Sequence, residues 1–136
     1  MTEPAESQIR HLEMIQGVIN RMAGNSFALK ALSGTITAAV IAYAGATNDP
    51  ASWFAAAGIL PAAIFWIMDA KYLRLEKLFR ALHDGVRSGK VQEPFDMNFM
   101  RYDKTVEGLA KVAISWSVAW FYLTLIVILI VLTLMD

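Results

Sequence analysis

Residues 121–134 read FYLTLIVILIVLTL, and no charged side chain occurs in the 24 residues between Lys111 and Asp136. A helix needs about 20 such residues to cross about 30 Å of hydrocarbon. The stretch has no polar face, which counts against the alternative that residues 29–69 form buried helices of a soluble bundle. It therefore predicts a membrane-spanning helix at 110–135.

Two further charge-free stretches precede it, of eighteen residues after Lys30 and nineteen residues before Asp69. They predict spans at 29–47 and 52–69. The first is rich in Ala, Gly, Ser and Thr and gains little on transfer to lipid, so we expect its insertion to depend on a partner helix. Turn-forming residues separate the two stretches and favour a helical hairpin; they are Asn48, Asp49 and Pro50.

The composition agrees with a membrane protein and excludes several other classes. Of the 136 residues, 57% are apolar and 18% are charged, with twelve Lys+Arg against twelve Asp+Glu and no Cys. Ordinary soluble domains are about 45–50% apolar and about 25% charged. A disordered chain, a disulfide-stapled module and a basic nucleic-acid binder are excluded. We predict an all-α integral membrane protein with three transmembrane helices and amphipathic cytoplasmic helices.

The predicted organisation and orientation follow from the positions of the charges. A cytoplasmic amphipathic helix occupies 1–26, a transmembrane hairpin 27–70, a cytoplasmic helical extension and loop 71–109, and the third transmembrane helix 110–136. Three of the Lys and Arg residues precede the first span, and the other nine lie between the second and third spans. Because Lys and Arg favour the cytoplasmic side of a membrane, we expect a cytoplasmic N-terminus and an outside C-terminus.

The segment before the first span has apolar residues at helical spacing. Its charges are balanced, which favours packing on another protein helix over lying on a lipid surface. Gly24 and Asn25 predict the end of this helix, and Ser26 the cap of the next. The apolar stripe consists of Ile9, Leu12, Ile15, Ile19 and Met22.

The segment after the second span continues the helical pattern. We expect one helix from about Ser52 to Arg87, bent at Pro61. Its cytoplasmic stripe and that of the first helix can bury each other, within one protomer or between protomers. The loop that follows is unusually apolar and can dock on the helices or enter the membrane interface. The stripe is Leu75, Leu78, Phe79, Leu82 and Val86, and the loop residues are Phe95, Phe99, Met100 and Tyr102.

The sequence contains no motif that points to catalysis. His11 and His83 are its histidines, and neither has a second ligand at the spacing of a metal site. No phosphate-binding loop and no pairing of a nucleophile with a base is recognisable. We predict a protein that is not an enzyme and that has no cofactor and no metal.

Small residues recur every fourth position in the first span, at Gly34, Ala38, Ala42 and Ala46. Such a stripe lets helices approach closely in lipid. It packs the hairpin within one protomer or forms a contact between protomers. The second span offers a similar surface at Ala51, Ala55, Gly58 and Ala62.

Polar residues in the spans suggest where a pore would be lined. Ser33, Thr35 and Thr37 belong to the least apolar span, which is the natural lining of a pore in an oligomer, although a hydroxyl can also bond its own helix. Asp69, at the end of the second span, forms either an ion pair, for example with Lys30, or a ring of carboxylates at a pore mouth. No ionisable side chain lies deep in a span, which argues against a proton-coupled transporter.

A cytoplasmic basic face follows the second span, at Lys71, Arg74, Lys77 and Arg80. These residues could meet anionic lipid headgroups or a phosphate-bearing ligand in the cytoplasm. The preference of basic residues for the cytoplasmic side accounts for most of them without a ligand.

Two stretches resemble a group of small bacterial membrane proteins. RMAGNSFALK (21–30) matches their RMA-x-NSF-x-LK segment, and FWIMDAKYLRLEKLFRALHDGVR (65–87) matches their FW-x-x-DA-x-YLR-x-E-x-LFR-x-L segment. The layout is also similar to the SLATT-type membrane effectors, with a third span added. This resemblance implies a bacterial inner-membrane protein of antiphage defence that forms pores and stays shut until a cytoplasmic signal arrives.

The resulting hypothesis is a homo-oligomeric membrane effector or channel-like protein, gated through its cytoplasmic helices. The alternative is a non-conducting scaffold or accessory subunit that recruits a cytoplasmic partner. The expected partners are the lipid bilayer, further copies of the chain, and a cytoplasmic protein or an anionic ligand, but no nucleic acid.

Overall fold

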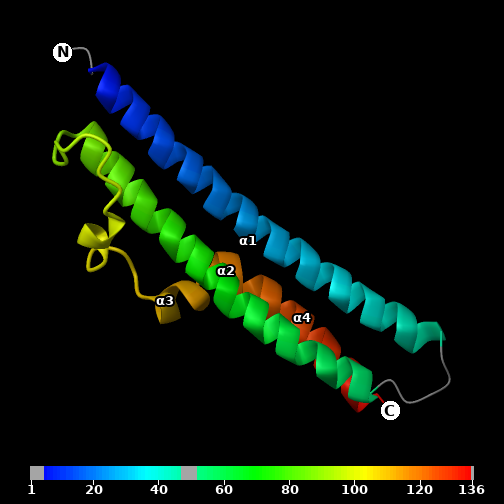
Figure 1. Cartoon of the computed structure of the whole chain (residues 1–136). Helices are drawn as coiled ribbons and strands as arrows, with labels where there is room; N and C mark the ends of the chain where they lie inside the picture. Colours follow the sequence, from blue (N-terminus) through cyan, green and yellow to red (C-terminus); the bar gives the residue numbers. More distant parts are fainter. Residues whose placement is uncertain (1–4, 47–51, 136) are drawn as a thin grey trace.

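The structure, a computed structural model, describes residues 5–46 and 52–135, and these are all-α. They form α1 (Glu6–Ala46), α2 (Ser52–Arg87), the 3₁₀ helix η1 (Phe99–Tyr102), the short α3 (Leu109–Ala113) and α4 (Trp116–Leu134). Helices α1 and α2 are antiparallel, and α4 lies beside the first half of α2 (Figure 1). The predicted fold class is confirmed, since α1, α2 and α4 are each long and apolar enough to cross a membrane.

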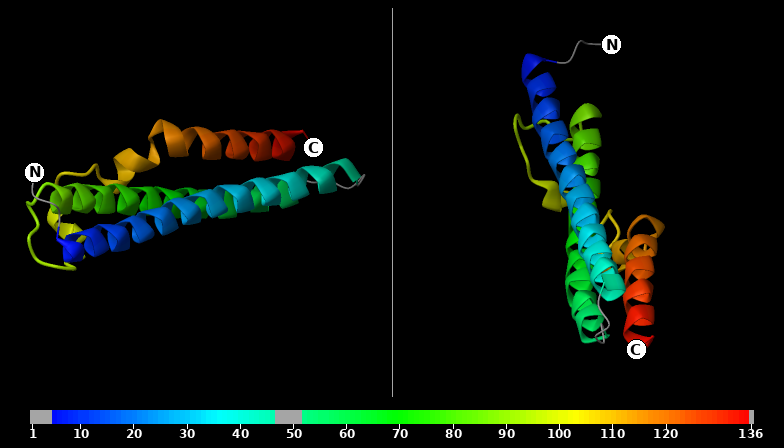
Figure 2. Two further views of the ribbon diagram at one scale, coloured as in Figure 1. Left: turned by 90° about the horizontal axis from the view of Figure 1, so that it is seen from above. Right: turned by 90° about the vertical axis from the view of Figure 1, so that its right-hand side faces the viewer.

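The molecule has two halves along its length (Figure 2). In the membrane half, residues 27–46 of α1 and 53–70 of α2 lie beside α4. The arm, residues 5–26 and 71–113, continues past the start of α4. From Trp53 to Lys71, α2 rises about 27 Å at 1.5 Å per residue, which is close to the hydrocarbon thickness of about 30 Å. Exposed tryptophans occur at both ends of this length, as at membrane interfaces; they are Trp53, Trp116 and Trp120.

Helix α1 is one helix of 41 residues, so the predicted stop at Gly24 and Asn25 is wrong. A glycine in a helix costs about 1 kcal/mol relative to alanine. Tertiary contacts on both sides of Gly24 outweigh this cost, because Ile19 is buried in the arm and Ser26 bonds Asp69 of α2. Ser26 is therefore not a helix cap, and the predicted boundary between 1–26 and 27–70 falls inside a helix.

Helix α2 has the predicted bounds and continues through Pro61. It ends at Arg87, and Gly89, two residues further on, has a φ of 73°, the left-handed conformation that glycine adopts without strain. The Lys90 amide donates to the Gly85 carbonyl at 2.9 Å, and the Gly89 amide donates to the Val86 carbonyl at 3.1 Å. This pair of bonds is a Schellman cap and stops the helix.

The predicted third span at 110–135 is interrupted near Ser115, so α4 begins at Trp116. The Ser115 hydroxyl donates to the Val112 carbonyl at 2.6 Å. The indole of Trp66 donates to the Ala113 carbonyl at 2.8 Å, which is the oxygen that a continuing helix would bond internally. Side-chain hydrogen bonds thus replace the helical ones and separate α3 from α4.

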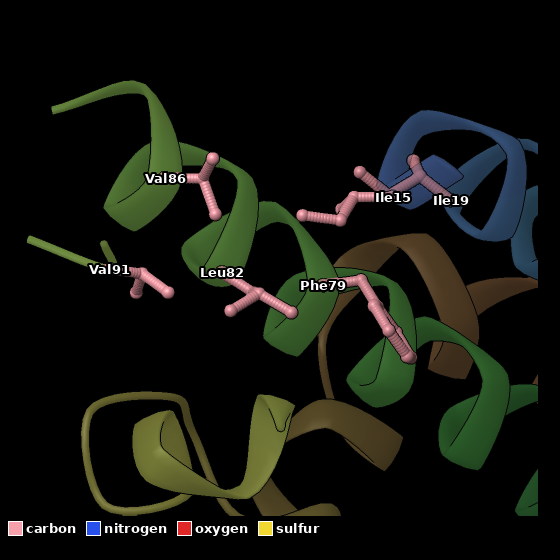
Figure 3. Close-up of a cluster of buried hydrophobic side chains, with 6 residues drawn as sticks. All are labelled: Ile15, Ile19, Phe79, Leu82, Val86 and Val91. Carbon is pink, nitrogen blue, oxygen red and sulfur yellow. The ribbon is translucent and has the colours of Figure 1, made fainter. Parts of the chain in front are cut away.

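The arm has its own hydrophobic core, in which the stripes of α1 and α2 meet within one chain (Figure 3). Of the predicted loop residues, Phe99 and Tyr102 pack against this core, whereas Phe95 and Met100 remain exposed. Ile9 of the α1 stripe is also exposed. The buried members of the core are Ile15, Ile19, Phe79, Leu82, Val86 and Val91.

Candidate functional site

A buried carboxylate joins α1 to α2 at the end of the membrane half. Asp69 is fully buried on α2 and accepts hydrogen bonds from the hydroxyl of Ser26 and the ammonium of Lys30. Lys30 also donates to the Ser26 hydroxyl at 3.1 Å, and its side chain is 25% exposed. Because Ser26 and Lys30 are one turn apart on α1, both reach the same carboxylate.

Helix α4 contributes Tyr122 to the same place. Its ring is buried and stacks on Trp66, with ring centroids 6.3 Å apart and planes inclined by 4°. Its hydroxyl lies close to the side chains of Asp69 and Ser33. Among the described residues, the hydroxyls of Ser33 and Tyr122 are buried without a hydrogen-bond partner. We call Ser26, Lys30, Ser33, Asp69 and Tyr122 the polar cluster.

The polar cluster fixes how the three long helices align. Removing a charge from water is costly, so a buried ion pair such as Lys30–Asp69 contributes little net stability while it is intact. Removing one partner leaves an uncompensated charge, which strongly destabilises the packing. Any sliding of α1 along α2 separates Lys30 from Asp69, so the pair selects one register of the two helices.

The predicted pore-lining residues lie on two faces of α1. Ser33 and Thr37 are buried, and the Thr37 hydroxyl donates to the Ser33 carbonyl at 3.0 Å. Thr35 is exposed and donates to the Ala31 carbonyl at 2.9 Å. A pore lined by Ser33 and Thr37 therefore requires the helices of one chain to separate. Pore lining stays a prediction for these three residues. For Asp69, the structure contains the ion pair with Lys30, which was one of the two alternatives, and a role at a pore mouth stays a prediction.

The small residues of α2 take part in packing within the chain. Ala55, Gly58 and Ala62 are buried, and a Cβ at Gly58 would lie 3.3 Å from Leu129 of α4 and 3.6 Å from Val40 of α1. Ala51 lies outside the described residues. On α1, Gly34 is half-buried and the rest of its predicted stripe, Ala38, Ala42 and Ala46, is exposed. The contact between protomers through the α1 stripe stays a prediction.

The basic face of α2 is largely engaged by carboxylates of the loop. Arg74 pairs with Asp103 at 2.7 Å and donates to the Glu107 carbonyl at 3.0 Å, while Lys77 and Lys111 bind the Glu107 carboxylate at 2.8 and 3.0 Å. Hydrogen bonds from Lys77 and then from Lys111 hold the pKa of Glu107 below its ordinary value. We call these five residues the ionic clasp. Of the other predicted members, Arg80 pairs with Glu76 at 2.7 Å and Lys71 is exposed.

The burial of His11 was not predicted from the sequence. His11 is buried, and its Nε2 donates to the Asp96 carbonyl at 2.8 Å. The signal was its position, because His11 precedes Ile15 and Ile19 by one and two turns on the buried face of α1. Within the described ranges, no group of three or more His, Cys, Asp or Glu side chains is placed to hold a metal ion.

Comparison with known protein families, with curated proteins and with solved structures finds no match. Fold and site together define a small all-α protein with three helices able to cross a membrane, joined by a buried polar cluster.

Proposed function

We propose that the chain assembles with further copies of itself in a bacterial inner membrane and acts as an effector or channel-like protein, gated through its cytoplasmic arm. The polar cluster supports this proposal best, because it brings hydroxyl groups and charged side chains from three apolar helices together in one place. In the structure Ser33, Asp69 and Tyr122 are buried between the helices, and Ser26 and Lys30 are partly buried. Opening the cluster would expose these side chains to water and give ions a polar entrance at this end of the membrane half.

The arm is suited to control this opening because α1 and α2 run without a break from the arm into the membrane half. A change in the packing of the arm core, which contains Ile15 and Leu82, can therefore shift Lys30 relative to Asp69. Such a switch needs a signal that prefers one of two packings. The role in antiphage defence rests on the resemblance of residues 21–30 and 65–87, and the orientation rests on the distribution of Lys and Arg.

The experiment is to express the protein in bacterial cells and to follow the membrane potential. Lys30→Met and Asp69→Asn, which break the buried pair, are expected to lower the potential more than the wild type does. Lys71→Met, a change of an exposed lysine on the same helix as Asp69, serves as the control. Full retention of the potential by both cluster variants, with the proteins present in the membrane, would refute the channel-like function.

A second function, a non-conducting scaffold, is favoured by an exposed apolar patch on the arm. Ile9, Met14 and Phe95 are each more than a third exposed and are bordered by charged residues of α1. Phe95 also has a φ of 60°, which is uncommon for a residue other than glycine. A detergent-solubilised mass of one chain, or of a complex held only with another protein, would support the scaffold over the homo-oligomer.

A further inference from the structure

Cations from two helices converge on neighbouring carboxylates in the ionic clasp. Lys77 of α2 and Lys111 of α3 bind the two oxygens of Glu107 at 2.8 and 3.0 Å, and Arg74 binds Asp103 at 2.7 Å. Phosphate oxygens accept the same charge-assisted hydrogen bonds as carboxylate oxygens. A set of cations that holds Glu107 in this way can therefore hold a phosphate.

The clasp lies where lipid headgroups would be found. Arg74 and Lys77 follow Lys71 by three and six residues, which places them about 5 and 9 Å beyond the end of the membrane half. The polar layer on each side of a bilayer is about 5–7 Å thick, so the backbone of Arg74 lies within it and that of Lys77 lies just beyond its outer edge. Lys111 is also followed by Ile114 and Trp116, which are 74% and 76% exposed. An anion bound here would have apolar side chains next to it on the membrane side.

We propose that the ionic clasp is a binding site for the phosphate of an anionic phospholipid, and that Glu107 occupies this site when the lipid is absent. The proposal rests on the membrane location in the proposed function, but it does not require the protein to conduct ions. A lipid fits better than a soluble phosphate, because its acyl chains can cover Ile114, Trp116 and Trp120, which a free phosphate would leave exposed.

Exchange between Glu107 and a lipid phosphate is feasible because the clasp is accessible to water. The side chains of Glu107 and Asp103 are 39% and 42% exposed. Ion pairs at such positions are weak and are screened by salt. An anionic bilayer surface attracts Lys and Arg and repels carboxylates. Once Glu107 is released, residues 103–113 lose part of their attachment to α2, and α4 follows directly after them.

The test uses native mass spectrometry of the full-length protein in detergent, with phosphatidylglycerol as the probe and phosphatidylcholine as the neutral competitor. Glu107→Gln removes the internal competitor, so we expect about fivefold tighter retention of phosphatidylglycerol. Glu93→Gln makes the same charge change at an exposed loop position outside the clasp and should have little effect. Lys77→Gln should weaken retention about fivefold, and Lys90→Gln, its matched control, much less.

Three results would overturn the proposal. Equal gains for Glu107→Gln and Glu93→Gln would mean that only net charge matters. Equal losses for Lys77→Gln and Lys90→Gln would mean that the clasp is not the site. Displacement of phosphatidylglycerol by an equal concentration of inorganic phosphate would assign the site to a soluble phosphate. Because no arm of this test measures conduction, a failure here is distinct from a failure of the proposed function.

Discussion

Lys30→Met is expected to destabilise the protein more than Asp69→Asn, although the two side chains form one ion pair. Met at position 30 leaves a fully buried carboxylate with the Ser26 hydroxyl as its remaining donor, and a buried charge without its partner costs about 3–5 kcal/mol. Asn at position 69 removes the charge and still accepts from Ser26. The Lys30 side chain, which is 25% exposed, can then turn its ammonium toward water, so we expect a loss of about 1–2 kcal/mol.

The assay is unfolding by sodium dodecyl sulfate in mixed micelles, followed by fluorescence of the four tryptophans. Lys30→Met/Asp69→Asn should recover about 2 kcal/mol relative to Lys30→Met, because it leaves no buried charge. Lys71→Met, at an exposed position, should change the free energy of unfolding by less than about 0.5 kcal/mol. The reasoning is refuted if Asp69→Asn is the more harmful single change, or if the two losses simply add in the double variant.

Three further predictions concern the arm and the topology. Gly85→Ala should destabilise the protein by about 1–3 kcal/mol, because the new Cβ would lie 1.9 Å from the Tyr102 hydroxyl. Gly17→Ala, which has open space around it, should stabilise the protein by up to about 1 kcal/mol. Equal effects of the two changes on thermal unfolding in detergent would contradict the docked position of Tyr102. The contacts of Glu107 lower its pKa, so the ionic clasp should be intact above pH 4.5, the ordinary pKa of a glutamate, and should loosen as the pH falls below that value. Amide hydrogen exchange of residues 103–113 would report this loosening. Glu107→Gln should remove the pH dependence. In this cysteine-free sequence, single cysteines at positions 90 and 134 should react with an impermeant reagent from opposite sides of the membrane, and labelling from the same side would exclude three crossings.

The sequence predicted the features that depend on local composition. The apolar stretches, the bounds of α2 and the amphipathic stripes of the arm follow from hydropathy and from helical spacing, and each was found close to its predicted position. Asp69 was likewise placed at the end of the second span from the local sequence. These properties are encoded within a few turns of the chain, so no tertiary information was needed.

The features that were missed depend on contacts between distant residues. Gly24 is a helix breaker by local propensity, yet the anchoring of Ser26 to a carboxylate 43 residues away keeps α1 continuous. The start of α4 depends on Trp66, which bonds a carbonyl 47 residues away. Tyr122 carries no sequence signal that would link it to Ser33 and Asp69. Spacing along the chain identifies a helix face but not the side chain that meets it.

The unbroken length of α1 has a mechanical consequence. Forty-one residues form a stiff rod of about 60 Å, and Ser26 lies at its midpoint. If α1 pivots as a rigid rod about Ser26, a tilt of about 5° displaces each end of the helix by roughly 2.6 Å, in opposite directions. That swing is nearly the length of a hydrogen bond, so a small push at the Glu6 end of α1 would be felt at its Ala46 end.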